Sequence, residues 1–407
     1  MDKIFGKQKK PYIKFIIIAA IAVILVGALV TGVLLIRKDN TTSKKSSETA
    51  SDTHKVNETT HAAVVKETTA ASSESAAQTS TESTTAAQTT IAATIPETQP
   101  PINPGISNNS NLSGYLHTSG NKLVDGSGNV VQLRGVSTHG ISWFPEYVNY
   151  DAFASLKNDW GANVVRLAMY PAEYNGYLTG GDKNALKQII DNGVNYATQL
   201  GMYVIIDWHV LNYQPSQYTS QACEFFAEMA SKYSGHNNVI YEICNEPVGA
   251  DWNSNIKPYA ETVINTIRQY DDHALILVGT NTWSQDVDAV VGNALNDSNV
   301  MYVLHFYAAT HKDNIRNKLQ TALNAGLPVF VSECSICDAS GNGGIDYDSA
   351  NTWLNYMNSN DISFIAWSLC NKNETSALIA PWCNKLSGWS DDELSETGRW
   401  FKTAIKR

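Results

Sequence analysis

Eight apolar runs, many of them rich in Val and Ile, recur in the C-terminal three-quarters of the chain, and polar stretches separate them. The runs are 130–136, 163–170, 203–209, 239–245, 274–280, 300–307, 328–333 and 362–369. Apolar runs of this length, bounded by polar or turn residues, are typical of buried strands. Between most of them, apolar residues recur at the helical period, for example at 183–200, 220–233, 259–270, 314–325 and 348–358.

Strands that alternate with helices predict an α/β fold with a parallel sheet. Eight such units within nearly 300 residues fit a (β/α)8 TIM barrel. A doubly wound sheet is the alternative, but no glycine-rich phosphate loop follows the first run. We therefore predict a barrel domain at 111–407.

The N-terminus has a different pattern, in which a lysine-rich segment at 1–14 precedes 22 uncharged residues at 15–36. At about 1.5 Å per residue, a helix of that length spans a bilayer core of roughly 30 Å. We predict an uncleaved transmembrane signal anchor, with the lysines in the cytoplasm and the barrel outside the cell membrane. Secretion after cleavage of this segment is the alternative.

Residues 37–110 predict a disordered linker. Ser, Thr and Ala dominate this segment, and it contains no Phe, Trp or Tyr. Such a composition cannot bury enough apolar surface to offset chain entropy. The chain thus divides into a cytoplasmic segment, an anchor, a tether and one barrel.

Charge and cysteine content exclude several classes of function. Beyond Lys45 the chain has 20 basic against 37 acidic residues, so nucleic acid is not an expected partner. Six cysteines are too few for a disulfide scaffold, and the single C-x-x-C at Cys334 and Cys337 lacks the second pair typical of a zinc site. We expect a monomer that needs no cofactor.

Polar and aromatic side chains gather at the ends of the predicted strands, where the active site of such a barrel lies. One such residue alone is most often a satisfied core group, but seven strand ends carry them together. They are His139 and Trp143, Arg166 and Tyr170, Asp207 to His209, Asn245 and Glu246, His305 to Tyr307, Glu333, and Trp367.

Glu246 and Glu333 are the pair that predicts a reaction. They end the fourth and seventh strands, which face each other across the barrel mouth. Retaining glycoside hydrolysis uses two carboxyl groups about 5–5.5 Å apart, one as acid/base and one as nucleophile. Arg166 and Tyr307 are expected to keep Glu333 ionised, and Glu246 beside Asn245 is expected to stay protonated.

A metal site formed by His139, His209 and His305 is the competing interpretation. It lacks a closely spaced ligand pair such as H-E-x-x-H, so we predict no metal. Trp143, Trp208 and Trp367 are core residues by default, but flat rings at a barrel mouth also suit sugar stacking.

The strand-end motifs resemble glycoside hydrolase family 5, and in particular its bacterial endoglucanases. The motifs are LRGVSTHG at 133–140, VRLAMY at 165–170, YVIIDWH at 203–209, VIYEICNEP at 239–247, VGTNTWSQD at 278–286 and VLHFYAATH at 303–311. The resemblance implies a (β/α)8 barrel with Glu246 as acid/base and Glu333 as nucleophile.

The resemblance also implies the substrate-binding residues. Asn245 would bond the sugar 2-hydroxyl, and Arg166, His209, His305 and Tyr307 would support the two carboxyls. Trp143 and Trp367 would stack on sugar rings, and Lys372 and Glu374 would contact a glucose on the non-reducing side. His139 and Tyr170 complete the expected site.

The chain departs from the family pattern at two places. The family commonly follows its nucleophile with Trp-Gly, whereas Glu333 precedes Cys334 and Ser335, which puts a subsite wall in question. Cys370 and Cys383 flank the last loop, where a disulfide is a hypothesis.

The function we expect is endo-1,4-β-glucanase activity (cellulase, EC 3.2.1.4) on β-glucan, with retention of configuration. A family 5 hydrolase of mannan, xylan or mixed-linkage glucan is the nearest alternative. An inactive carbohydrate-binding barrel on the cell surface is a second alternative, which the presence of both glutamates disfavours.

Overall fold

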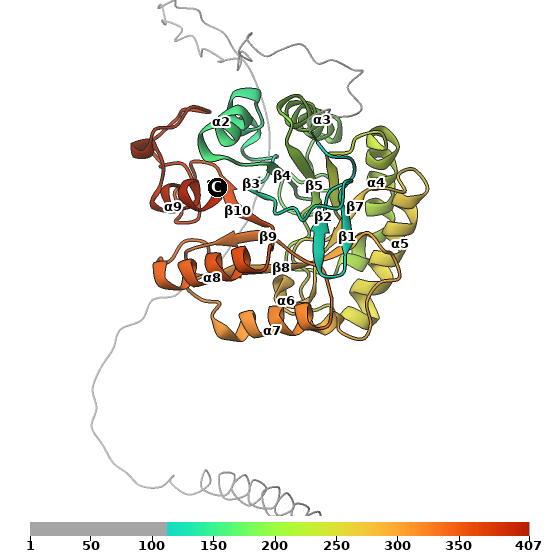
Figure 1. The fold of residues 1–407 in the computed structure, drawn as a ribbon. Coiled ribbons are helices and arrows are strands. Elements are labelled where there is room, and N and C mark those ends of the chain that lie inside the picture. Colours follow the sequence, from blue (N-terminus) through green and yellow to red (C-terminus); the bar gives the residue numbers. More distant parts are fainter. Residues whose placement is uncertain (1–111, 407) are drawn as a thin grey trace, which may run out of the picture. The chain divides into compact units, whose positions relative to one another are not determined.

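The computed structural model describes residues 112–406, which form a closed barrel of eight parallel strands (Figure 1). Neighbouring strands pair in the order β10-β3-β4-β5-β6-β7-β8-β9. The strands are β3 (Arg134–Thr138), β4 (Val164–Met169), β5 (Tyr203–Trp208), β6 (Val239–Glu242), β7 (Leu275–Val278), β8 (Val300–Tyr307), β9 (Val329–Ser335) and β10 (Phe364–Leu369). The predicted barrel is confirmed, although β3 begins four residues later than the apolar run suggested.

Helices surround the barrel and mostly follow the strands in the chain (Figure 1). They are α2 (Tyr150–Trp160), α3 (Lys183–Leu200), α4 (Thr219–Tyr233), α5 (Lys257–Arg268), the short α6 (Asn281–Ser284), α7 (Asp313–Asn324), α8 (Tyr347–Ser359) and α9 (Glu396–Ile405). The five helices named from the sequence are present to within two residues at each end, whereas α2, α6 and α9 lie outside the named ranges.

Helix α3 shows why its predicted ends are right. Asp182 caps the first turn, because its carboxylate accepts from the backbone N–H groups of Asn184 and Ala185. Gly201 ends the helix with a left-handed φ of 68° that a side chain would oppose.

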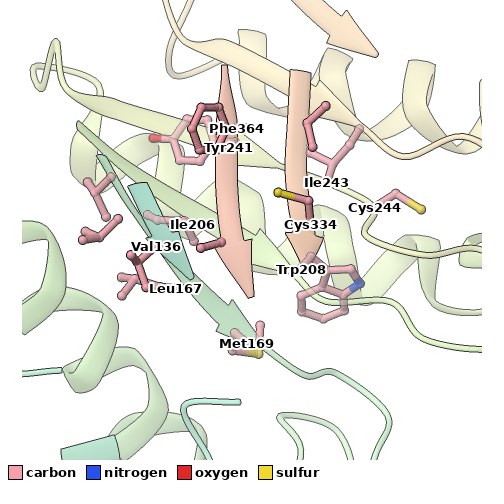
Figure 2. Close-up of a cluster of buried hydrophobic side chains, with 14 of the residues drawn as sticks. Val136, Leu167, Met169, Ile206, Trp208, Tyr241, Ile243, Cys244, Cys334 and Phe364 are labelled. Atoms are coloured by element: carbon pink, nitrogen blue, oxygen red, sulfur yellow. The ribbon is translucent and has the colours of Figure 1, made fainter. Parts of the chain in front are cut away.

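Alternate residues of each strand face two different cores. Outward residues such as Val165, Leu167 and Met169 pack against the helices, in the layer that Figure 2 shows. Inward residues near the strand starts, such as Val164, Ile205 and Ile240, fill the lower barrel. The upper barrel is polar and holds the site.

A hairpin of β1 (His117–Ser119) and β2 (Lys122–Val124) closes the lower end of the barrel. Leu116 and Leu123 belong to the same cluster as the inward residues of the lower barrel. Water is thereby excluded from the end opposite the site.

The predictions for 1–14, 15–36 and 37–110 lie outside the described residues. Among residues 112–406, every helix is too short or too polar to cross a bilayer.

Candidate active site

The barrel mouth brings the predicted residues together. Arg166 lies at its centre and is fully buried. Its Nε and Nη2 donate to Glu242 at 2.7 and 3.0 Å, and Nη2 also donates to Asn245 Oδ1 at 2.7 Å. Nη1 reaches Glu333 Oε2 at 3.4 Å, and Nη2 lies 3.0 Å from Asp207 Oδ2. One guanidinium therefore aligns three carboxyl groups and an amide.

Glu333 lies on β9 and points into the mouth, where the Tyr307 hydroxyl donates to its Oε1 at 2.7 Å. Burial and the neighbouring Glu246 raise the pKa of Glu333 to about 7, against the opposing effects of His305, Arg166 and Tyr307. The predicted partners are confirmed, but they offset only part of the burial effect.

Glu246 stands four residues beyond the end of β6, in a loop rather than at the strand tip that the sequence predicted. Its backbone N–H donates to Val210 O at 2.9 Å, and it forms an isolated bridge with Leu211. Beyond the end of β6, the Ile243 N–H still donates to Leu277 O at 3.0 Å, and Cys244 O accepts from the Gly279 N–H at 2.9 Å. Burial raises the pKa of Glu246 to about 8.

The two glutamates lie close together. Oxygens of Glu246 and Glu333 and a ring nitrogen of His305 all lie within 4.8 Å of one another. His305 Nδ1 is 2.9 Å from Glu246 Oε1. Two carboxyl groups at this separation, with the higher pKa on Glu246, match an acid and a nucleophile.

Aromatic rings form one wall of the mouth. Trp143 packs on Tyr170 at 4.5 Å between ring centroids, and Tyr170 packs on His209 at 4.2 Å. His209 stacks on Trp367 at 5.2 Å, and Trp367 contacts His139 at 5.3 Å. This wall is the kind of surface on which the apolar faces of sugars pack.

Lys372 and Glu374 lie at the edge of this wall. Glu374 lies 3.8 Å from His139 Nε2, and Lys372 Nζ lies 2.6 Å from Glu374. Contacts thus join the predicted site residues into one cluster at the barrel mouth, in which Arg166 and Asn245 are fully buried.

Two groups of potential metal donors lie within 4.8 Å in the described chain, and the three-histidine set is not among them. The group of His139, Cys370 and Glu374 does not suit a metal, because Gly140 N–H donates to His139 Nδ1 and leaves the ring proton on Nε2. The group of Glu246, His305 and Glu333 faces the Arg166 guanidinium. Neither group of donor residues therefore suits a resident metal ion.

A pocket of about 330 Å³ opens beside Glu246, and none of the rings of the aromatic wall lines it. Its lining residues are Glu246, Trp283, Gln285, His305, Tyr307, His311 and Ala339. The Trp283 indole donates to Asn212 Oδ1 at 2.9 Å. Trp283 was not predicted as a site residue, although it stands inside one of the strand-end motifs.

The family profile described as Cellulase (glycosyl hydrolase family 5) matches residues 124–373. The chain belongs to glycosyl hydrolase family 5.

Relatives within the family support this assignment. The chain is 44% identical over 298 residues to an endoglucanase of Clostridium saccharobutylicum, with 72% of this chain and 65% of the relative covered. It is 47% identical over 299 residues to endoglucanase A of Butyrivibrio fibrisolvens, with 72% and 69% covered. The chain therefore spans about two thirds of the length of these relatives.

A solved structure has the same fold. It is a variant of the catalytic domain of endoglucanase Cel5A from Thermobifida fusca in complex with cellotetraose. This chain matches it with a TM-score of 0.68 and 36% identity, over 72% of this chain and 97% of that one.

The structure explains the two departures from the family 5 pattern, at Cys334 and at the pair Cys370 and Cys383, in different ways. Cys334 points outward into the layer under the helices, among residues such as Trp208 and Ile243 in Figure 2. A side chain there cannot form a subsite wall. Cys370 and Cys383 are buried free thiols, so the hypothesised disulfide is absent from this structure.

Sequence reasoning missed two buried polar residues of this family 5 site, Glu242 and Ser332. Glu242 is the main partner of Arg166, and Ser332 Oγ lies 2.9 Å from His305 Nε2. Asp207 was named at its strand end without a role, and the structure places its Oδ2 2.6 Å from His209 Nδ1. Glu242 stands inside a quoted motif, where a charge in an apolar strand is the signal. Ser332 carries no such signal.

Proposed function

We propose that this chain is an endo-acting β-1,4-glucanase that hydrolyses cellulose and related β-glucans with retention of configuration. The approach of the Glu246 and Glu333 carboxyls to within 4.8 Å carries the proposal. The names of the relatives, which are endoglucanases, support the substrate class.

In the first step, ionised Glu333 attacks the anomeric carbon while Glu246 gives its proton to the leaving glycosidic oxygen. The product is a glycosyl ester on Glu333. In the second step, Glu246 takes a proton from water as that water attacks the anomeric carbon and releases Glu333. The Tyr307 hydroxyl and Arg166 stabilise the carboxylate whenever it is free.

Asn245 is fitted to bind the sugar 2-hydroxyl. Arg166 holds its Oδ1, and its Nδ2 donates one hydrogen to Val210 O at 3.0 Å. One amide hydrogen remains for a sugar oxygen. Sugars on the non-reducing side pack against the aromatic wall, within reach of Lys372 and Glu374.

The substrate test is reducing-sugar release by the purified full chain from carboxymethyl cellulose, β-glucan, mannan and xylan. We expect activity on the two glucans and a loss of roughly 10⁴-fold or more in Glu333→Gln. Glu246→Gln should lose activity on polymer but still release one equivalent of phenol from an aryl glucoside whose leaving group needs no acid, because only the second step then lacks its base. Glu261→Gln, at an exposed helix position, is the matched control.

Other outcomes would change the proposal in defined ways. A preference for mannan or xylan would leave the proposed retaining mechanism unchanged and would replace glucan with that polysaccharide as the substrate. A folded, inert chain that is retarded on a glucan column would replace the enzyme with a carbohydrate-binding barrel.

We also propose that residues 15–36 anchor the chain in the cell membrane, with the barrel outside and monomeric. The length of the uncharged segment and the preceding lysines support this placement. Membrane fractionation with alkaline extraction tests it, and a shortened, secreted product would favour cleavage instead. Light scattering of the detergent-solubilised chain tests the monomer.

A further inference from the structure

A chain of hydrogen bonds runs from the proposed acid to the centre of the site. His305 Nδ1 lies 2.9 Å from Glu246 Oε1, and His305 Nε2 lies 2.9 Å from Ser332 Oγ. The Ser332 hydroxyl donates to Glu242 Oε1 at 2.7 Å. Glu242 in turn binds Arg166 through both of its oxygens.

Glu242, the last acceptor, determines which atom donates in each of these hydrogen bonds. A carboxylate held by a guanidinium through two bonds can only accept, so the Ser332 hydroxyl must point its proton at Glu242. The Ser332 oxygen then has only lone pairs to offer His305, and Nε2 must carry the ring proton. Burial lowers the pKa of His305 to about 4, so the ring is neutral and Nδ1 is bare.

A β-bulge makes the arrangement possible. Val303 and His305 on β8 pair with Phe330 and Glu333 on β9, so the one residue between them on β8 faces two residues on β9. The extra residue turns both Ser332 and Glu333 into the barrel, where strict alternation would bring in only one of them. Ser332 is buried with no exposed surface.

We propose that Ser332 is a positioning residue that, with Glu242, fixes the tautomer of His305 so that Nδ1 accepts a hydrogen bond from the protonated Glu246 carboxyl. This inference rests on the proposed role of Glu246 as the acid. A bare Nδ1 stabilises the protonated acid before the first step. Once the proton has left, the same lone pair faces the carboxylate and favours recovery of a proton from water in the second step.

Several charged or titratable groups also face Glu246. They are Arg166 on β4, Tyr170 after β4, Asp207 on β5, Glu242 on β6, Tyr307 on β8, His311 after β8, and Glu333 on β9. Arg166 favours the ionised form of Glu246, and the acidic groups favour its protonated form. Among the described residues, His305 is the group hydrogen-bonded to the Glu246 carboxyl. A change in its tautomer therefore shifts the pKa of Glu246 while the effects of the other groups stay the same.

The tautomer can be read directly in the wild-type full chain by NMR with ¹⁵N-labelled histidine. The spectrum of His305→Ala identifies the signals of His305 among the nine histidines. We expect the proton on Nε2 and a bare Nδ1 at neutral pH. A proton on Nδ1 would overturn the proposal, and this test needs neither activity nor a destabilising variant.

The Ser332→Ala variant tests the consequence. Without the serine oxygen, the His305 proton moves to Nδ1 and donates to Glu246, which favours the ionised acid. The alkaline limb of the kcat/KM profile should move about one pH unit towards acid. At pH values above the limb kcat/KM should then be about tenfold lower than in the wild type, and at pH values below the limb it should change little. Ser332→Thr, which keeps a hydroxyl, should restore the wild-type limb.

Ser335→Ala is the matched control, because Ser335 is a buried hydroxyl on the same strand that contacts Cys337 rather than His305. Its pH profile should equal that of the wild type. An unchanged alkaline limb in Ser332→Ala, or an equal shift in Ser335→Ala, would sink the positioning role. A wild type with no activity but with the proton on Nε2 would instead refute the proposed function and leave the tautomer assignment standing.

Discussion

Arg166 is held more closely by Glu242 than by Glu333. Two guanidinium nitrogens lie 2.7 and 3.0 Å from the Glu242 oxygens, whereas Glu333 is 3.4 Å away. The planar fork of arginine suits this two-point contact, and it leaves the third nitrogen to face Glu333. Glu242 therefore orients the cation that stabilises the proposed nucleophile.

Arg166→Lys should be far from conservative. An ammonium cannot bind both Glu242 oxygens and still reach Glu333 and Asn245. We expect kcat to fall at least about 100-fold and the free energy of unfolding to fall by about 3 kcal/mol. Steady-state kinetics and urea unfolding measure the two effects.

Arg268→Lys provides the control for that variant. Arg268 binds Asp297 through two nitrogens at 2.8 and 3.0 Å, at the end of α5 and away from the mouth. It should lose some stability and keep kcat. An Arg166→Lys enzyme with full activity would show that Glu333 does not need the guanidinium.

Tyr307→Phe removes the hydroxyl that donates to Glu333 Oε1 at 2.7 Å. The hydrogen bond lowers the pKa of Glu333, so its loss should raise that pKa further and move the acid limb of kcat/KM towards alkali. We expect kcat to fall roughly 10- to 100-fold at the optimum. A fall in kcat with an unmoved acid limb would mean that the hydroxyl serves the substrate and not the carboxylate.

How much of this site the sequence could predict depends on the kind of position. Glu246 and Glu333 could be found because an acid that follows an apolar run is conspicuous, and because the strand count places both at one mouth. Ser332 could not, since its inward direction depends on a bulge that a period-two pattern does not contain. The loop position of Glu246 was missed because the apolar run at 239–244 continues past Glu242, where β6 ends.

The pH dependence of activity should be bell-shaped. The reaction needs Glu333 ionised and Glu246 protonated, and their pKa values lie at about 7 and about 8 in the free enzyme. The acid limb of kcat/KM therefore reports chiefly Glu333 and the alkaline limb chiefly Glu246, as values of a coupled pair. An optimum below pH 5 would contradict this assignment.

The same two groups should make the enzyme less stable as pH rises. Both pKa values are raised above the usual 4.5, so between pH 4.5 and about 8 the folded state binds more protons than the unfolded state. Stability then falls with increasing pH across that window. Glu333→Gln should accordingly raise Tm at pH 8 and leave it nearly unchanged at pH 4, while Glu261→Gln should do neither. Equal effects at the two pH values would disprove the linkage.

Trp283 should bind the sugar that leaves. It lines the pocket beside Glu246, the proposed proton donor, and 40% of its surface is exposed there. The Trp283 backbone has a left-handed φ of 53°, which a bulky residue rarely adopts. The indole Nε1–H donates to Asn212 Oδ1, and this hydrogen bond fixes the orientation of the ring. Trp283→Ala should raise KM for long cello-oligosaccharides roughly tenfold with kcat nearly unchanged.

Asn212→Ala should act in the same direction but less strongly, because it frees the ring without removing it. Tyr270→Ala is the matched control, since Tyr270 is also an exposed aromatic residue but follows α5 at the lower end of the barrel. Oligosaccharide kinetics across chain lengths separate the cases. If Trp283→Ala raised KM equally for substrates too short to extend past Glu246, the ring would serve the general shape of the mouth, and the leaving-side role would be wrong.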